Sequence, residues 1–226
     1  ECDWSSDVCS SDLLFVQTSQ ADMIRNNEFD TIYHEHISFY NINSMNELCK
    51  RSGMYLIDVV KCPLHGNSYI FVISKNRNIA RPANIENHIT MERKAGLLTE
   101  KTYIDYAKNC ETITQKLVDT IRACKAVDRS VKFLGYGAAA KGMTLLNYAK
   151  LDLDWIVDDN PLKQNRFTPG RGTPILGPDS IKDIHNVVFI PLAWNFFDEI
   201  RSKIKSMRPN ADDHFITYFP KVEFKR

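Results

Sequence analysis

The chain has 226 residues, 43% hydrophobic and 25% charged, which are ordinary fractions for a globular protein. Its formal net charge of +1 argues against a dedicated nucleic-acid binder, because such proteins carry a strong basic surplus. No apolar run approaches the ~20 residues of a membrane span, and no signal-peptide pattern opens the chain. The six cysteines are scattered without zinc-ligand spacing, so we expect no metal site and a reducing, cytoplasmic location.

The first thirteen residues, ECDWSSDVCSSDL, differ in composition from the rest of the chain. They carry four acidic and no basic residues, and from Cys2 onward they resemble the translation of a sequencing adaptor. We therefore expect residues 1–13 to be a non-native leader and the chain to be a fragment, the alternative being a genuine polar tail. The remainder is mildly basic, which is compatible with an anionic substrate.

Three β-rich runs and one helix are predicted before residue 76. LLFVQTS (13–19) is typical of a buried strand, and MYLIDVVKC (54–62) and SYIFVISK (68–75) flank a Pro/Gly turn. This pattern predicts a hairpin at a sheet edge. Between them, SMNELCKRSG suggests a helix with a capping box formed by Ser44 and Glu47, ending at Gly53.

The second half of the chain predicts a different architecture. The polar stretch 76–88 is a candidate boundary, and 89–127 carries the apolar spacing of one or two long amphipathic helices. From Val131 onward strands alternate with helices, as in VKFLGYG, AAAKGMTLLNYA, LDWIVDDN and VVFIPLA. Such alternation is typical of a parallel sheet in an α/β domain.

A glycine turn lies between a predicted strand and a predicted helix. FLGYGAAAKG contains Gly135 and Gly137 at the spacing of a G-x-G-x-x-A turn, with Lys141 at the start of the helix. Such a turn brings backbone N–H groups to an anion, and the trailing Asp158 stands where an acid often meets a ribose hydroxyl. The pattern favours an anion or nucleotide site, and the alternative is tight strand–helix packing without a ligand.

The segment TIYHEHISFY (31–40) concentrates titratable groups in an aromatic stretch. In an extended segment His34 and His36 would share one face. Three interpretations remain open from the residues alone: a metal site completed by His65, a general base with a pKa near ~6.5, or a structural histidine pair.

The order of these motifs resembles the C-terminal half of the sugar-nucleotide C-methyltransferase family, whose members use S-adenosylmethionine on NDP-4-keto-deoxysugars. The resemblance rests on FDTIYHEHISFY, LHGNS, GAAAKGMTLLNY, VDDNPLKQNRFTPG and LAWNFFDEI. It implies an α/β chain with the last strands of a class I methyltransferase sheet (14–78), a helical connector (79–128) and a Rossmann-like domain (129–226). The early strands with the adenosylmethionine loop, and the cysteines of a zinc-binding lobe, have no counterpart in this sequence.

The resemblance also implies roles for particular residues. His36 would take the C3 proton of the sugar, while Tyr33 and Glu35 would hydrogen-bond the sugar. A nucleotide-sugar partner would be held by a wider set of residues, namely His65, Ser68, Gly135, Gly137, Lys141, Asp158, Trp194 and Asn195. We expect this chain alone to be inactive in methyl transfer.

The sequence departs from the family pattern at one place. Where the family commonly has HGGS followed by an arginine, this chain has HGNSYI, with Asn67 and Ile70. This difference bears on the geometry with which the family binds its sugar. The alternative to an enzyme is a non-catalytic nucleotide-sugar-binding or regulatory Rossmann-like module.

Overall fold

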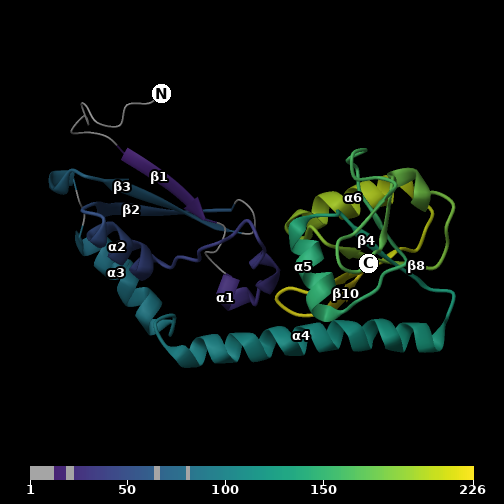
Figure 1. Ribbon diagram of the computed structural model, residues 1–226. Helices are drawn as coiled ribbons and strands as arrows, with labels where there is room; N and C mark the ends of the chain where they lie inside the picture. Colours follow the sequence, from purple (N-terminus) through teal and green to yellow (C-terminus); the bar gives the residue numbers. More distant parts are fainter. Residues whose placement is uncertain (1–12, 19–22, 64–66, 80–81) are drawn as a thin grey trace. The chain divides into compact units, whose positions relative to one another are not determined.

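The computed structural model describes residues 13–18, 23–63, 67–79 and 82–226, and it divides the chain into two compact units (Figure 1). The first unit contains the described residues up to 23 and residues 37–105. The second contains residues 24–36 and 106–226. The expected leader lies outside the described residues, apart from Leu13.

The first unit is built on a small antiparallel sheet. Strands β1 (Leu13–Thr18), β3 (Ser68–Ser74) and β2 (Tyr55–Cys62) lie in the order β1-β3-β2, and β3 is antiparallel to both neighbours. The three predicted strands and the hairpin of the last two are thereby confirmed. The predicted burial of the first strand is wrong, because β1 lies at an edge of the sheet and Leu13, Leu14 and Phe15 are exposed. Helices α2 (Ile42–Arg51) and α3 (Pro82–Lys94) pack against β2, and their apolar side chains form a common core with Phe71 and Ile73 of β3.

The predicted capping box of α2 is wrong. The helix begins earlier, with Asn41 as its N-cap, and the Asn41 side chain accepts a hydrogen bond from the backbone N–H of Ser44 at 2.7 Å. Glu47 instead forms an exposed ion pair with Lys50. Two further N–H groups of the first turn donate to the buried carboxylate of Glu92 on α3, at 2.6 and 3.0 Å.

Helix α3 begins at Pro82, inside the stretch 76–88 that we expected to be a boundary. Proline suits the first turn of a helix, because its missing N–H would have no helical partner there. Helix α4 (Glu100–Val127) follows after a short turn, so 89–127 contains parts of two helices, as the apolar spacing predicted. From Tyr106 onward α4 belongs to the second unit.

The second unit contains a sheet in the order β10-β9-β8-β4-β5-β7-β6. Its central pairs, from β9 to β7, are parallel, and the two edge strands β10 and β6 are antiparallel. This arrangement confirms the α/β class that the alternating pattern predicted. The strands are β4 (Lys132–Tyr136), β5 (Trp155–Val157), β6 (Arg166–Phe167), β7 (Pro174–Leu176), β8 (Val187–Pro191), β9 (His214–Thr217) and β10 (Glu223–Lys225).

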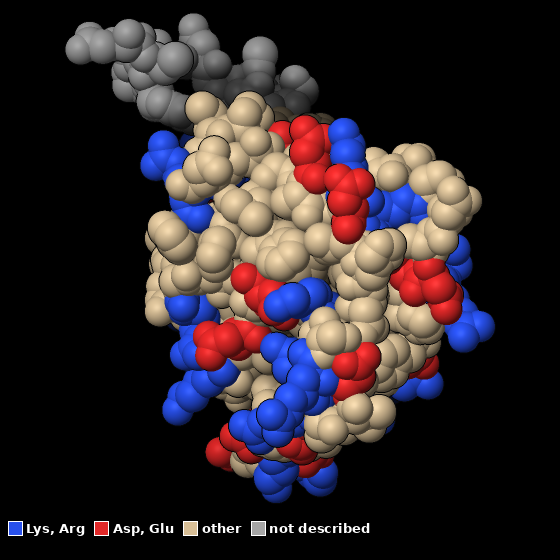
Figure 2. Space-filling view, turned by 90° about the vertical axis from the view of Figure 1, so that its right-hand side faces the viewer, with Lys and Arg blue, Asp and Glu red and all other residues tan. Residues whose placement is uncertain are grey.

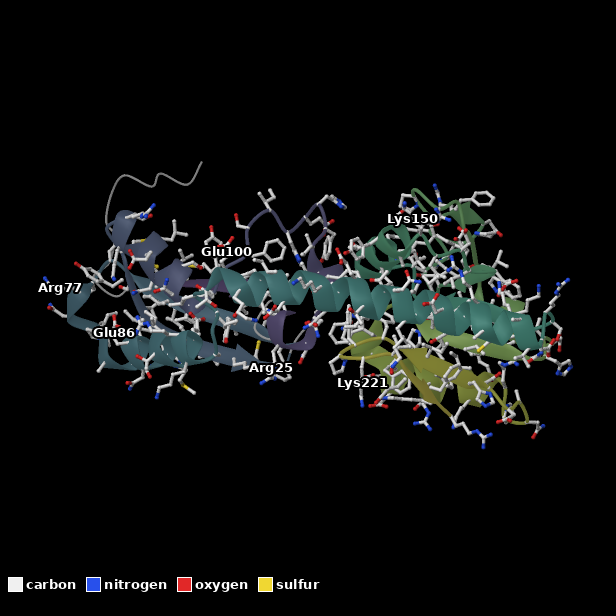
Figure 3. All side chains as sticks on the ribbon, turned by 90° about the horizontal axis from the view of Figure 1, so that it is seen from below. Arg25, Arg77, Glu86, Glu100, Lys150 and Lys221 are labelled. Atoms are coloured by element: carbon white, nitrogen blue, oxygen red, sulfur yellow. The ribbon has the colours of Figure 1, made fainter. Side chains whose placement is uncertain are left out.

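Helices cover both faces of this sheet (Figure 1). Side chains of α4 and α5 (Ala140–Ala149) share one apolar core with the strands, and those of α6 (Phe197–Met207) share a second core on the other face. Successive residues such as Phe133 and Leu134 enter opposite cores, as the two-residue period of a strand requires. Lys150, the left-handed residue that ends α5, is exposed (Figure 3).

Gly142 allows α5 to lie close to the residues that follow β8. A Cβ at Gly142 would lie 2.6 Å from the Cβ of Leu192, which is shorter than real carbon contacts, so a side chain there would force the helix away. A Cβ at Gly135 on β4 would meet the side-chain ends of Leu192, Ile156 and Leu153, none of which lies on α5. Tight strand–helix packing, one of the two interpretations of the glycine turn, therefore accounts for Gly142.

Candidate functional site

The segment that carries the histidines belongs to the second unit. Helix α1 (Met23–Asn26) is followed by the 3-10 helix η1 (Phe29–Thr31), which packs against α5. Residues 33–35 then form a turn, closed by the N–H of His36 donating to the carbonyl of Tyr33 at 2.9 Å. The extended conformation in which His34 and His36 would share one face is therefore not found.

The turn fixes the imidazole of His36. Its Nδ1 lies 2.8 Å from the carbonyl oxygen of Thr31, and its ring lies 4.1 Å from the Tyr33 ring between centroids. A carbonyl oxygen can only accept a hydrogen bond, so Nδ1 carries the proton in the neutral ring and Nε2 carries the lone pair. A histidine held in this tautomer is suited to act as a base through Nε2.

The other members of the segment are more exposed. The side chains of His34 and Glu35 are 83% and 70% exposed, and His34 Nε2 lies 3.9 Å from Glu35 Oε1. Burial, followed by the charges of Glu35 and Asp30, raises the pKa of the Tyr33 hydroxyl. Tyr33 therefore stays protonated at neutral pH and can donate a hydrogen bond to a substrate oxygen.

The structure brings Asp30 into the site, a residue that the sequence analysis missed. Asp30 is fully buried and accepts a hydrogen bond from Trp194 Nε1 on Oδ2 at 2.7 Å, whereas Oδ1 has no hydrogen-bond partner among the described residues. Burial raises the pKa of its carboxyl to about 7. A carboxylate inside FDT is an unremarkable sequence feature, and only the fold shows that it is sealed.

Trp194, Lys141 and Asn195 lie near the carboxyl ends of the strands. Trp194 and Asn195 open the 3-10 helix η4 (Trp194–Phe196) directly after β8, and the Lys141 ammonium lies 4.8 Å from the centre of the Trp194 ring. Ligands of open α/β sheets bind at this edge. Three of the predicted site residues are therefore neighbours at an edge of the sheet suited to an anion.

The backbone amides of the glycine turn already have acceptors. Gly137, at φ +86°, donates to the carbonyl of Val157 at 2.8 Å, and Ala138 donates to Asp158 Oδ2 at 2.6 Å. Ala139 donates to the carbonyl of Gly137 at 2.9 Å. Because these three N–H groups already have acceptors, they form no cradle for the phosphates of a nucleotide.

Asp158 braces this turn from the end of β5. Its Oδ1 accepts a hydrogen bond from the N–H of Asn160 at 2.8 Å, and Lys163 lies 3.4 Å from Oδ2 while donating to the carbonyl of Ala138 at 2.9 Å. Both carboxylate oxygens are thus engaged by backbone N–H groups. This residue connects three loop segments of the second unit.

The residues expected from the HGNS motif belong to the first unit. His65 lies outside the described residues. Ser68 is fully buried, and its hydroxyl accepts a hydrogen bond from Gln17 Nε2 at 3.3 Å. Asn67 has a positive φ of 79°, a conformation that asparagine tolerates better than most residues, and the departing residue Ile70 is half-buried in β3.

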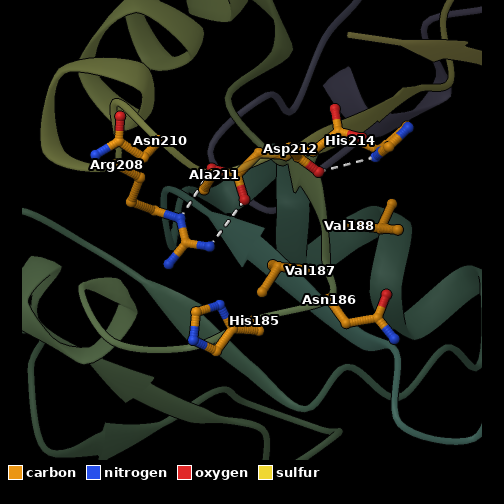
Figure 4. A pocket seen from close by; sticks show the side chains of 10 residues that line it. His185, Asn186, Val187, Val188, Arg208, Asn210, Ala211, Asp212 and His214 are labelled. Carbon is orange, nitrogen blue, oxygen red and sulfur yellow. Dashed lines mark hydrogen bonds and ion pairs between the residues drawn. The ribbon is translucent and has the colours of Figure 1, made fainter.

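A pocket of roughly 340 Å³ lies at the opposite end of the second sheet, at the start of β8 and β9 (Figure 4). It contains none of the predicted site residues. The guanidinium of Arg208 is already engaged by both oxygens of Asp213 and by the carbonyls of Ile181 and Ile184. A fully paired arginine offers no charge to a ligand, so we place the candidate site at the carboxyl ends.

Charges of both signs are interspersed on the face shown in Figure 2, without an extended basic field. In the part of the chain that the structure describes, no group of three or more His, Cys, Asp and Glu residues could hold a metal ion. Among the same residues, no helix is both long and apolar enough to cross a bilayer.

Comparison with known proteins agrees with this α/β arrangement. The family model of the C-methyltransferase C-terminal domain matches residues 63–220. The C-methyltransferase NovU of Streptomyces niveus is 30% identical over 214 residues, which cover 92% of this chain and 50% of NovU. The chain thus spans half the length of this curated relative. Because the family model covers more than half of the sequence, the chain belongs to the family of C-methyltransferase C-terminal domains.

Proposed function

We propose that this chain is the proton-abstracting and nucleotide-sugar-binding part of an S-adenosylmethionine-dependent C-methyltransferase that acts on an NDP-4-keto-deoxysugar. Family membership and the similarity to NovU support the reaction class. The observation that carries the mechanism is the contact between His36 Nδ1 and the Thr31 carbonyl at 2.8 Å, which leaves the lone pair on Nε2.

Carbon methylation needs a carbanion equivalent at the accepting carbon. A 4-keto group acidifies the neighbouring C3–H, because the negative charge that forms is delocalised onto the keto oxygen as an enolate. His36 Nε2 takes the C3 proton, and the Tyr33 hydroxyl, which is protonated at neutral pH, donates to a sugar oxygen. Glu35 is exposed enough to accept hydrogen bonds from sugar hydroxyls.

The nucleotide-sugar is proposed to lie against the carboxyl ends of the second sheet. Lys141 supplies a positive charge for a phosphate group, and Trp194 and Asn195 supply an aromatic surface and an amide next to it. Gly137 shapes the turn and Asp158 holds it in place.

The proposal is tested by the exchange of a single hydrogen, which requires no methyl donor. An NDP-4-keto-6-deoxyhexose is incubated with the 226-residue protein in D₂O, and loss of the C3 proton signal is followed by NMR. We expect His36→Asn to slow the catalysed exchange by roughly 10²–10⁴-fold, the usual contribution of a general base. Binding of the nucleotide-sugar, measured by calorimetry, should change little.

His34→Asn is the matched control, because His34 is the same side chain two residues away and is 83% exposed. Its exchange rate should stay within a few-fold of the wild type. If the wild-type protein binds the nucleotide-sugar without catalysing exchange, or if His36→Asn exchanges at the wild-type rate, the chain is a binding module instead of a source of the base.

A further inference from the structure

The buried carboxyl of Asp30 is the most unusual polar group of the second unit. It has no exposed surface, one of its oxygens accepts the Trp194 indole N–H, and the other has no hydrogen-bond partner among the described residues. Leaving a buried carboxyl oxygen unpaired is costly. Unfavourable groups of this kind tend to persist at functional sites, so a functional role for the Asp30 carboxyl is worth considering.

Ionisable groups face Asp30 from several elements. Lys141 on α5 favours the charged carboxylate, and Glu28, directly before η1, opposes it. The hydroxyls of Tyr106 on α4 and of Tyr218 after β9 are also close enough for the Asp30 charge to raise their pKa. Desolvation outweighs these charges and raises the pKa of Asp30 to about 7.

The backbone connects Asp30 directly to the proposed base. Asp30 and Thr31 are consecutive residues of η1, and the Thr31 carbonyl is the acceptor for His36 Nδ1. The Thr31 side chain is buried and its hydroxyl has no hydrogen-bond partner among the described residues, so it does not hold the carbonyl in place. The Thr31 carbonyl also accepts the Tyr33 N–H at 3.1 Å, a bond within the same segment. The side-chain hydrogen bond that ties η1 to another element is the one from Trp194 to Asp30.

Aromatic packing holds the other side of η1. The Phe29 ring lies 5.0 Å from that of Tyr148 and 5.4 Å from that of Phe219, between centroids. Such packing fixes rings against one another, whereas a hydrogen bond also fixes the direction in which one polar atom approaches its partner. The indole–carboxyl bond adds this directional contact, because it fixes one carboxyl oxygen of η1 against η4.

We propose that Asp30 is a positioning residue for His36: its hydrogen bond with Trp194 fixes η1, so that the Thr31 carbonyl holds the imidazole with Nδ1 protonated and Nε2 ready to accept a proton. This inference deepens the proposed function and rests on it for the consequence in catalysis. The anchoring itself is a property of the protein alone, and substrate-free measurements can test it.

The first test reads the tautomer of His36 from ¹⁵N chemical shifts of the imidazole at pH 8, without substrate. We expect mostly the Nδ1–H form in the wild type and in Asp30→Asn, whose amide oxygen can still accept the indole N–H. Asp30→Ala and Trp194→Phe each remove one partner, so the Nδ1–H fraction should fall in both. Asp179→Ala, at an exposed carboxylate of the same unit, is the control.

The second test measures C3–H exchange with the same variants. Asp30→Ala should lose roughly 10- to 100-fold in rate, a loss that a displacement of about 1 Å can cause, and Asp30→Asn should restore most of it. The proposal is overturned if Asp30→Ala, or Trp194→Phe should the alanine variant not fold, keeps the wild-type tautomer. If the wild-type protein catalyses no exchange, that result counts against the proposed function only. The positioning role of Asp30 is still tested by the His36 tautomer, which is measured without substrate.

Discussion

Two buried aspartates of the second unit, Asp158 and Asp30, are treated very differently by the fold. Both oxygens of Asp158 accept backbone N–H groups, and Lys163 lies beside it. Asp30 has one indole donor and one oxygen with no hydrogen-bond partner among the described residues. The first carboxylate holds loops together, whereas the second pays a desolvation cost that its contacts do not offset.

The difference shows how burial separates two kinds of acidic residue. A carboxylate with a complete set of donors stabilises the fold, and its removal exposes N–H groups that have lost their acceptor. A buried carboxylate with too few hydrogen-bond donors destabilises the fold in its charged form. Its replacement by a neutral side chain should therefore stabilise the protein at high pH, where the carboxyl would be charged. Substitution of Asp158 should therefore lower the free energy of unfolding, and substitution of Asp30 should raise it at high pH.

The largest expected effect is that of Asp158→Ala. This substitution leaves the Ala138 N–H without its acceptor and removes a second bond to Asn160, so the free energy of unfolding should fall by about 3 kcal/mol in urea titrations. Asp152→Ala, which removes an exposed carboxylate paired with Arg171, should cost less than about 1 kcal/mol. If the two variants lose the same free energy of unfolding, Asp158 does not have the structural role proposed for it.

Asp30→Asn should act in the opposite direction and only at high pH. Because the folded-state pKa of about 7 lies above the ordinary value of 3.8, the folded protein keeps a proton that the unfolded chain releases. Stability from this group is therefore present at low pH and decreases as the pH rises from about 4 to 7. We expect the stability of the variant relative to the wild type to grow by roughly 2–3 kcal/mol between pH 5 and pH 8, the range in which the folded carboxyl loses its proton.

This difference between the two pH values is the informative quantity, because constant effects of the substitution cancel in it. Glu92 of the first unit also has a raised pKa owing to burial, but it is present in both proteins and cancels as well. If the stability of the variant relative to the wild type does not change between pH 5 and pH 8, the pKa of Asp30 is not raised in the folded protein.

A smaller effect is expected from Lys141→Met. The positive charge of Lys141 lowers the pKa of Asp30, so its loss should move the titration midpoint of Asp30 upward from about 7. The indole N–H signal of Trp194 reports this titration in NMR spectra, because Trp194 donates directly to the carboxyl. Lys150→Met, at the exposed end of the same helix (Figure 3), should leave the midpoint where it is.

The smallest effect is expected from Lys163→Met. The Lys163 side chain is 42% exposed and only adds to a carboxylate whose oxygens already have backbone donors. We expect a loss of less than about 1 kcal/mol in the free energy of unfolding, further reduced by salt. A loss as large as that of Asp158→Ala would show that the ammonium, and not the backbone N–H groups, holds the turn.

Much of the fold could be predicted because its signals are local. Short β-rich runs predicted the strands of the first unit to within one residue at each end, although not the exposure of β1, and strand–helix alternation predicted the parallel sheet of the second unit. The capping of α2 failed because Ser44 and Asn41 are both good N-caps, and the sequence does not show which one the helix uses.

The candidate site was less predictable because it depends on contacts between distant residues. His36, Lys141 and Trp194 stood out through their motifs, but the bond from Trp194 to Asp30 joins segments that no sequence pattern relates. The sequence placed His34 and His36 on one face only on the condition that the segment is extended, and the backbone bond from His36 to Tyr33 shows a turn there instead. Whether a given carboxyl is buried depends on how the folded chain packs around it, so it cannot be predicted from the composition of the sequence.

The close approach of Gly142 to Leu192 couples two positions that lie on different elements. With only 2.6 Å available between a Cβ at 142 and that of Leu192, position 142 cannot take a side chain while residue 192 carries a Cβ. The restriction runs in one direction, because residue 192 can carry a Cβ as long as position 142 remains glycine. Library designs aimed at the neighbouring Trp194 should therefore keep Gly142.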